Sequence, residues 1–341
     1  MKNFTKLFAL LLLVSGSAFA QDIHFSQYYY SPLTMNPALT GSMDGTYRVG
    51  ALYRNQWSSI TNPYVYQTPA VYGDVALFQG SRDGSNLGLG AVVINDQQGS
   101  GALTTTEALG SLAWHQSLDG VGNYFLSVGV SGGLVQQQFD VTKLTFFDQF
   151  NGYDFLLPTG ETLGQQASYM LMNAGMAFNG VISDHSRISM GFSAFNLNEP
   201  KVTYSNDNSN VLNRHYVAHA GGTIGIQNKY FLFPNIEYMI QNADDELVLG
   251  SGVGYNFSPS PRRIGTVWYG GLFARQGGET RDMIFTTGII NKGLQAGVAY
   301  DLNSGSLSAA TGGNGGFEIA MIFTGAVKTI HRVKKQYCPR F

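Results

Sequence analysis

The sequence predicts an all-β protein: a transmembrane antiparallel β-barrel of about 14 strands, with an N-terminal plug-like segment and a short C-terminal periplasmic tail. Only 12% of the residues are charged, against about 25% in an ordinary soluble domain, whereas 13% are aromatic. Mean hydropathy is nevertheless close to zero. Apolar and small polar residues alternate from residue 46 to 327, which is typical of strands with one face toward lipid and one toward a lumen.

The first 20 residues have the features of an export signal. Lys2 and Lys6 precede an apolar run, and Ala18-Phe19-Ala20 has the small-x-small pattern that a signal peptidase cuts. The apolar run is shorter than the roughly 20 residues that a membrane-spanning helix needs. We therefore expect residues 1–20 to be removed after Ala20 and the mature protein, beginning at Gln21, to reside in the cell outer membrane.

Residues 21–45 precede the first predicted strand and form a periplasmic or plug-like segment. Several positions phased toward the lumen are small: Gly88, Gly90, Gly129, Ser131 and Gly191. Small residues allow a bulky group to approach the wall closely. The charges phased inward are few and of both signs: Arg48, Asp74, Glu107, Arg187, Glu237 and Glu318. An open solute pore would have a more polar lining, so we expect a lumen filled by residues 21–45.

Residues 46–327 contain the predicted barrel. Its strands lie near 46–54, 70–78, 87–95, 104–115, 123–133, 168–178, 187–196, 214–226, 230–240, 246–257, 264–274, 282–290, 294–302 and 316–327. Segments of about 9–11 residues are enough for tilted strands to cross a bilayer. A soluble β-sandwich, the alternative, would carry charges on its outer face, where this sequence places Val, Leu, Ile, Tyr and Phe. An even strand count places both chain ends in the periplasm.

The connections alternate between long and short. Long ones follow odd-numbered strands, at 55–69, 134–167, 197–213 and 303–315, and tight-turn pairs follow even-numbered strands, at Asp83-Gly84, Asp119-Gly120 and Asn179-Gly180. Long loops outside and short turns on the periplasmic side are usual in outer-membrane barrels. The connection 134–167 is aromatic, with Phe139, Phe146, Phe147, Phe150, Tyr153 and Phe155. It either offers a surface to a partner or packs over the barrel mouth.

Several function classes are disfavoured. A net charge of −2 argues against a nucleic-acid partner. No nucleophile-elbow, metalloprotease or phosphate-loop motif occurs, so we expect no enzyme and no cofactor. His215 and His219 lie on a predicted strand, where four residues span about 13 Å, too far for one metal ion. We expect no metal site. The acidic loops 206–208 and 244–246 could hold calcium, but most acidic loop tips are simply solvated.

Residues 328–341 form a basic tail with five Lys and Arg residues. It is either a disordered end or a cationic segment that docks on a periplasmic partner. Cys338 is the single cysteine of the chain, so no internal disulfide is expected.

Four segments together resemble the PorP/SprF family over essentially the whole mature chain. They are the opening Gln21 to Gln27, the Asn36-Pro37-Ala38-x-x-Gly41 motif, Tyr53-Arg54-x-Gln56-Trp57, and the ending Cys338-Pro339-Arg340-Phe341. The resemblance implies an outer-membrane component of the type IX secretion system of Bacteroidota. It further implies two kinds of partner, a large secreted protein such as a gliding-motility adhesin and the periplasmic ring of the secretion system, besides outer-membrane lipid.

The resemblance thus implies a barrel that helps to export or anchor a secreted surface protein, or that couples to the periplasmic ring, and the lack of catalytic motifs makes us expect it to be non-enzymatic. The expected partner-binding residues are Phe25, Gln27, Asn36, Pro37, Lys334, Lys335, Cys338, Pro339, Arg340 and Phe341. The alternative is a hydrophobic-solute transporter with an N-terminal hatch, which a lateral opening or a kinked strand lined by apolar inward residues would favour. A surface hydrolase would need Ser, His and an acid clustered at the rim.

Overall fold

The computed structural model describes residues 23–57, 66–79, 84–99, 103–120, 122–158, 166–204, 210–259, 265–278, 280–305 and 308–327. The predicted export signal and the basic tail lie outside these residues and stay predictions. No helix in the described part of the chain is long and apolar enough to cross a membrane.

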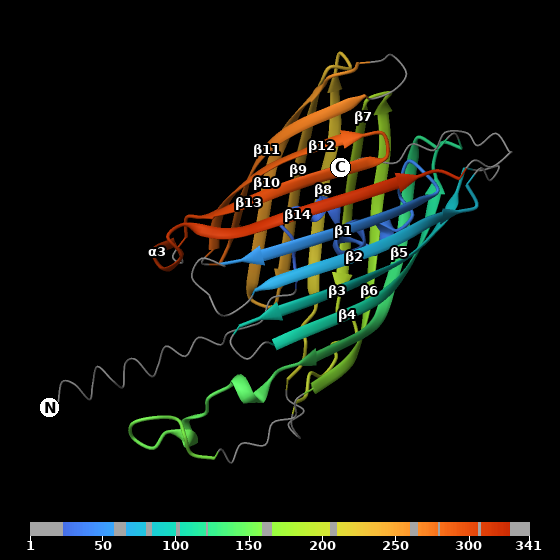
Figure 1. The fold of residues 1–341 in the computed structure, drawn as a ribbon. Helices are drawn as coiled ribbons and strands as arrows, with labels where there is room; N and C mark the ends of the chain where they lie inside the picture. Colours follow the sequence, from blue (N-terminus) through green and yellow to red (C-terminus); the bar gives the residue numbers. More distant parts are fainter. Residues whose placement is uncertain are drawn as a thin grey trace.

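One antiparallel sheet closes on itself to form a barrel (Figure 1). In the described part of the chain it has fourteen strands, and β14 pairs with β1 to close the ring. The strands are β1 (Tyr47–Gln56), β2 (Gln67–Leu77), β3 (Asn86–Gln98), β4 (Leu103–Ser117), β5 (Tyr124–Gln138), β6 (Gln166–Ser183), β7 (Ser186–Phe195), β8 (His215–Ile226), β9 (Tyr230–Gln241), β10 (Asp244–Asn256), β11 (Thr266–Gly277), β12 (Thr280–Asn291), β13 (Leu294–Asn303) and β14 (Asn314–Gly325). Because every strand has two neighbours, the wall has no free edge.

Side chains alternate between the outer face and the lumen along each strand. In β14, Met321 and Phe323 are about half exposed on the outer face, whereas Ala320 and Ile322 are buried inside. The same pattern gives the outer face of the barrel an apolar surface suited to lipid tails.

Each predicted strand overlaps one observed strand, so the predicted fold class is confirmed. Several strands are longer than predicted; β6, expected near 168–178, runs from Gln166 to Ser183. Apolar alternation marks only the lipid-facing part of a barrel strand, whereas the backbone ladder can continue beyond it. The predicted turn at Asn179-Gly180 is wrong, because this pair lies inside β6 and the turn falls at 184–185. Gly180 lies against the Tyr124 ring, which a Cβ would approach to 3.0 Å.

The two ends of the barrel differ. The connections β1–β2, β5–β6, β7–β8 and β13–β14 lie at what we call the long-loop end, with α3 (Ser308–Thr311) in the last of them (Figure 1). The opposite, short-turn end has tight connections. Gly120 has a φ of +63°, and the Asp119 carboxylate accepts hydrogen bonds from the backbone N–H groups of Gly122 and Asn123. This turn agrees with the prediction from Asp119-Gly120.

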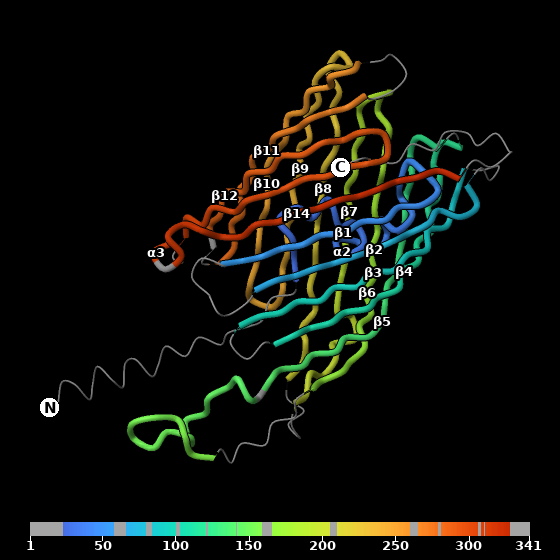
Figure 2. The backbone as a smooth tube through the Cα atoms, viewed as in Figure 1, coloured from blue at the N-terminus to red at the C-terminus, as the bar shows by residue number. Residues whose placement is uncertain are grey.

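Residues 23–46, called the N-terminal segment below, lie inside the barrel (Figure 2). The segment contains η1 (Tyr28–Tyr30), α2 (Pro32–Met35) and η2 (Pro37–Leu39). Its aromatic and aliphatic side chains pack with inward residues of the wall into one hydrophobic cluster. The core of this barrel is therefore its own lumen, filled by its own chain.

The N-terminal segment runs through the lumen from one end of the barrel to the other. The segment joins β1 at the short-turn end, but its first described residues lie at the other. Ile23 lies beside Arg54 and Gln56, and His24 lies beside Glu246 at the start of β10. The described start of the chain therefore lies at the long-loop end, because these residues cross the lumen to fill it. The two chain ends lie outside the described residues, so their expected place in the periplasm stays a prediction.

Candidate functional site

The middle of the N-terminal segment is fixed by Asn36, which is fully buried. Its side-chain Nδ2 lies 3.0 Å from the carbonyl oxygen of Met176 and 3.1 Å from Nε2 of His219. Its Oδ1 accepts a hydrogen bond from the backbone N–H of Ala38 at 2.9 Å, which caps η2. The Asn-Pro-Ala motif therefore shapes the segment and attaches it to β6 and β8.

Inward glycines allow this close packing. A Cβ on Gly88 would lie 1.9 Å from the carbonyl oxygen of Thr40, and one on Gly129 would lie 2.5 Å from the backbone of Pro37 and Ala38. A Cβ on Gly191 would lie 2.7 Å from Nδ2 of Asn36. The prediction that small inward residues admit a bulky group to the wall is thus confirmed.

A buried ion pair holds the segment near the short-turn end. Arg48 donates two hydrogen bonds to the Asp74 carboxylate, at 2.9 and 2.6 Å, and a third to the carbonyl oxygen of Leu39 at 3.1 Å. The Asp74 carboxylate also accepts the backbone N–H of Gly41 at 2.6 Å. Charge-assisted bonds of this bidentate form are among the strong ones. They attach β1 and β2 to the last turn of the segment.

Aromatic contacts hold the next part of the segment. The Tyr30 hydroxyl lies 2.8 Å from the hydroxyl of Tyr269, and Tyr72 donates to the carbonyl oxygen of Tyr30 at 2.9 Å. The Tyr29 ring stacks on Phe273 with centroids 5.9 Å apart.

A charged network holds the segment at the long-loop end. Glu318 accepts the backbone N–H groups of Ser26 and Gln27, at 2.6 and 2.9 Å. Arg275 donates to Ser26 Oγ at 2.6 Å and to the Asp301 carboxylate at 3.0 Å. Arg54 donates to the carbonyl oxygen of His24 and lies 3.4 Å from Glu318. All these wall side chains are buried, so separating any pair would leave an uncompensated charge.

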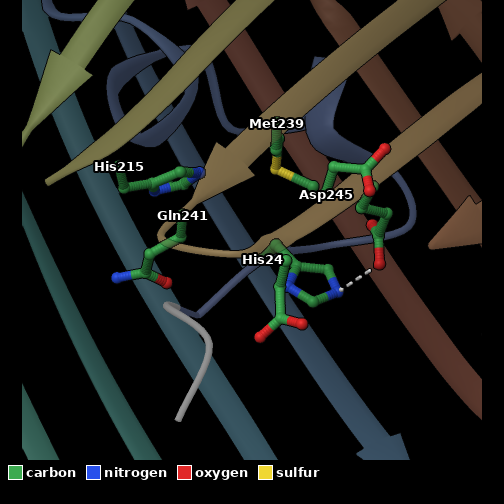
Figure 3. Close-up of a pocket in the computed structure, with 7 residues that line it drawn as sticks. His24, His215, Met239, Gln241 and Asp245 are labelled. Atoms are coloured by element: carbon green, nitrogen blue, oxygen red, sulfur yellow. Dashed lines mark ion pairs between the residues drawn. The ribbon is translucent and has the colours of Figure 1, made fainter. Parts of the chain in front are cut away.

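A cavity of about 340 Å³ lies above this network, at the long-loop end. We call it the mouth cavity; its lining includes Ile23, His24, Arg54, Trp57, Tyr66, Asp96, Glu246, Arg275, Asp282 and Asp301. A second, much smaller pocket adjoins it at the same end (Figure 3). There His24 lies 3.5 Å from the Glu246 carboxylate, with His215 and Gln241 nearby.

The inward charges were predicted in part. Arg48, Asp74, Arg187, Glu237 and Glu318 are buried, and Glu107 is half-buried. The lumen charges that were not predicted to point inward are the buried Arg54, Asp96, Glu246, Arg275 and Asp301, and Asp282, whose side chain is 11% exposed. All lie near the long-loop ends of their strands. Their alternation with outward-facing residues could have indicated that they point into the lumen. Asp96 and Arg275, however, lie one residue beyond the predicted strands 87–95 and 264–274.

The sequence-predicted partner residues fall into two groups. Phe25, Gln27, Asn36 and Pro37 are enclosed by the barrel wall. Lys334, Lys335, Cys338, Pro339, Arg340 and Phe341 lie outside the described residues. The structure therefore brings the first group together as part of the N-terminal segment, and the roles of both groups toward a partner stay predictions.

The connection between β5 and β6 is exposed over its described part, residues 139–158. It extends beyond the barrel at the long-loop end (Figure 1) and contains η3 (Val141–Lys143) and η4 (Phe147–Gln149). Phe147 is 89% exposed and Tyr153 is 98% exposed, so these rings do not pack over the mouth. Phe150 and Phe155 form a bridge with ring centroids 5.0 Å apart. This aromatic loop is an apolar surface of the kind that partners cover.

A closed antiparallel barrel with an apolar outer face and a lumen that its own chain fills defines an integral outer-membrane β-barrel. The sequence-family model described as type IX secretion system membrane protein PorP/SprF matches residues 17–323. The chain belongs to this family. Among curated protein sequences none matches the chain.

Solved structures show the same architecture. The chain is similar to the CymD monoaromatic hydrocarbon channel, with a TM-score of 0.51 and 12% identity over 93% of this chain and 96% of that one. The toluene transporter TbuX of Ralstonia pickettii gives a TM-score of 0.46 and 12% identity over 85% and 92% of the two chains. At such identity the likeness to CymD shows the barrel fold alone.

Proposed function

We propose that this chain is a non-enzymatic barrel that helps to export or anchor a secreted surface protein, such as an adhesin, and couples it to the periplasmic ring of the type IX secretion system. The observation that carries the proposal is the occupied lumen. The N-terminal segment crosses it and is held by buried ion pairs at both ends. A barrel filled in this way is suited to binding other proteins at its rims rather than to passing a solute.

The two rims offer different surfaces in this proposal. The long-loop end faces outward and presents the aromatic loop, whose Phe147 and Tyr153 are almost fully exposed. The short-turn end faces the periplasm, where the basic residues Lys334, Lys335 and Arg340 contact the ring. Removal of the export signal after Ala20 precedes insertion.

The buried partner residues act indirectly in this proposal. Phe25, Gln27, Asn36 and Pro37 set the position of the N-terminal segment, whose first described residues lie at the long-loop rim. A partner that binds at that rim contacts a barrel opening whose shape depends on the position of the N-terminal segment in the lumen.

A hydrophobic-solute transporter is supported less well. It needs an apolar path or a lateral opening, and in the described part of the wall each strand pairs with both neighbours. Among the described strand residues, register shifts occur between Val181 and Ser183 and between Tyr300 and Leu302. The inward side chains around Ser26 are charged and paired, which favours a fixed plug over a hatch.

A pull-down tests the proposal. Tagged protein is purified from its native cells in mild detergent, and everything that co-purifies is identified by mass spectrometry. A large secreted protein or periplasmic ring subunits support the anchor, and replacing Phe147 and Tyr153 with Ser should lose the secreted partner. Phe78→Ser is the matched control, because Phe78 is 70% exposed but lies at the short-turn end. Recovery of lipid or small hydrophobic molecules alone would favour the transporter.

A further inference from the structure

The mouth cavity has more acidic than basic groups. Its lining contains four carboxylates, Asp96, Glu246, Asp282 and Asp301, against two guanidinium groups, Arg54 and Arg275, and the imidazole of His24. Glu318, which pairs with Arg54 in the β1–β14 ladder but is not part of the cavity lining, adds a fifth carboxylate 3.4 Å from Arg54. Buried charges are normally balanced, because an uncompensated one is costly. The excess of negative charge therefore indicates that a positive group belongs in the cavity.

The unused acceptors lie on the cavity wall. Oδ1 of Asp301 is buried without a hydrogen-bond donor, as is Oδ1 of Asp282, and the Asp301 side chain is only 2% exposed. Asp96 is 5% exposed. Its carboxylate accepts hydrogen bonds from Thr68 Oγ1 at 2.6 Å and from Gln98, but it forms no ion pair with any described residue. These carboxylate oxygens would be satisfied by a positively charged hydrogen-bond donor in the cavity.

The rim adds an aromatic wall. Trp57 and Tyr66 line the cavity, and their rings pack edge to face with centroids 5.2 Å apart. Aromatic faces attract cations and also pack against aliphatic chains. A volume of about 340 Å³ is at the lower end of the range of small-ligand sites, large enough for one long side chain.

An organic cation fits this lining better than a metal ion. No group of three or more His, Cys, Asp or Glu side chains in the described part of the chain is placed to hold a metal. The guanidinium groups of Arg54 and Arg275 would also repel a divalent ion more strongly than a singly charged organic cation. We propose that the mouth cavity is a binding site for an ammonium or guanidinium group carried on a slim aliphatic chain. The group enters from the long-loop end, its head meets Asp96, Asp282 and Asp301, and its stem packs on Trp57 and Tyr66.

Two sources share this chemistry, a Lys or Arg side chain of a peptide and a free diamine. The inference goes beyond the proposed function and does not depend on which protein binds at the rim. Small probes test it directly on the purified full chain in detergent. With Trp114→Phe and Trp268→Phe in place, Trp57 is the remaining tryptophan of the three and reports binding through its fluorescence.

The probes are Nα-acetyl-lysine amide, Nα-acetyl-arginine amide and 1,5-diaminopentane, with Nα-acetyl-norleucine amide as the uncharged control. We expect a saturable fluorescence change with the charged probes and none with the norleucine compound. Tighter binding of the blocked amino acids identifies a peptide side chain as the source, and tighter binding of the diamine identifies a free diamine.

Two variants test the lining. Asp96→Asn should weaken binding by about tenfold or more, as expected for loss of one charge-assisted hydrogen bond, and Asp282→Asn provides a second test if the first fails to fold. Asp148→Asn, an exposed change in the aromatic loop, should bind as the parent does. Equal responses to the lysine and norleucine compounds would overturn the proposal. So would unchanged binding in both lining variants, or a Trp57 response to calcium chloride that the ammonium probes do not compete away.

Discussion

Asp74 shows how single residues make a filled lumen stable. A carboxylate enclosed by protein is costly unless donors surround it, and this one receives Arg48 from β1 and the Gly41 N–H from the N-terminal segment. The pair is almost fully buried, with side-chain exposures of 9% and 0%. One ion pair thus joins the wall and the segment, and each part stabilises the other.

We predict that Arg48→Met destabilises the folded barrel by about 3 to 5 kcal/mol, because it leaves Asp74 buried without its cation. The midpoint of heat-induced loss of the compact band on SDS gels measures the effect. Arg214→Met is the matched control: its partner Glu199 lies 3.3 Å away, but both side chains are nearly half exposed, so the loss should stay below about 1 kcal/mol. Equal midpoints for the two variants would contradict the prediction.

We also predict that Gly129→Ala displaces the N-terminal segment, because the new Cβ would lie 2.5 Å from the backbone of Pro37 and Ala38. Overpacking of this kind costs about 1 to 3 kcal/mol. Gly110→Ala on the neighbouring strand is the control, since nothing lies closer than 4.0 Å to its added Cβ. Limited proteolysis followed by mass spectrometry should show cleavage within residues 23–46 only in Gly129→Ala, and a protected segment in both would refute this.

At the scale of elements, the strands were predictable because lipid and lumen impose a period of two on every one of them. The course of residues 23–46 was not. Its helical turns are short, and their position depends on contacts with distant strands, such as Asn36 with His219 and Ser26 with Glu318. Inward glycines such as Gly129 indicated that something fills the lumen. They could not indicate that the segment crosses it to the long-loop end.

The terminal tail is an element whose role can be separated from the barrel. β14 ends at Gly325 and pairs with β1 and β13 over most of its length, so the ladder closes without residues 328–341. We predict that deleting them leaves insertion and the heat-induced transition unchanged but weakens coupling to ring subunits in the pull-down. Replacing Lys334, Lys335 and Arg340 with Gln should reproduce the loss if charge is the cause. Failure of the deletion variant to insert would show that the tail is an assembly signal instead.

At the scale of the whole molecule, strand number decides how much lumen must be filled. About eight strands close around their own side chains, whereas 16 to 18 leave an aqueous channel. The fourteen strands described here lie between these cases, so their inward side chains alone leave space. The N-terminal segment takes that space, and its backbone N–H groups at Ser26, Gln27 and Gly41 are satisfied by wall carboxylates.

It follows that removing the segment should convert a closed barrel into a pore. We predict that a variant lacking residues 23–44, with the export signal retained, gives steady ion currents in planar bilayers, whereas the intact protein gives none. Replacing residues 142–157 of the aromatic loop with a Gly-Ser linker is the control, because that loop lies outside the lumen and should leave the bilayer as tight as the intact protein does. Heat-induced mobility shifts confirm that each variant has folded. Steady currents through the intact protein, equal to those of the deletion variant, would mean that the segment does not seal the lumen.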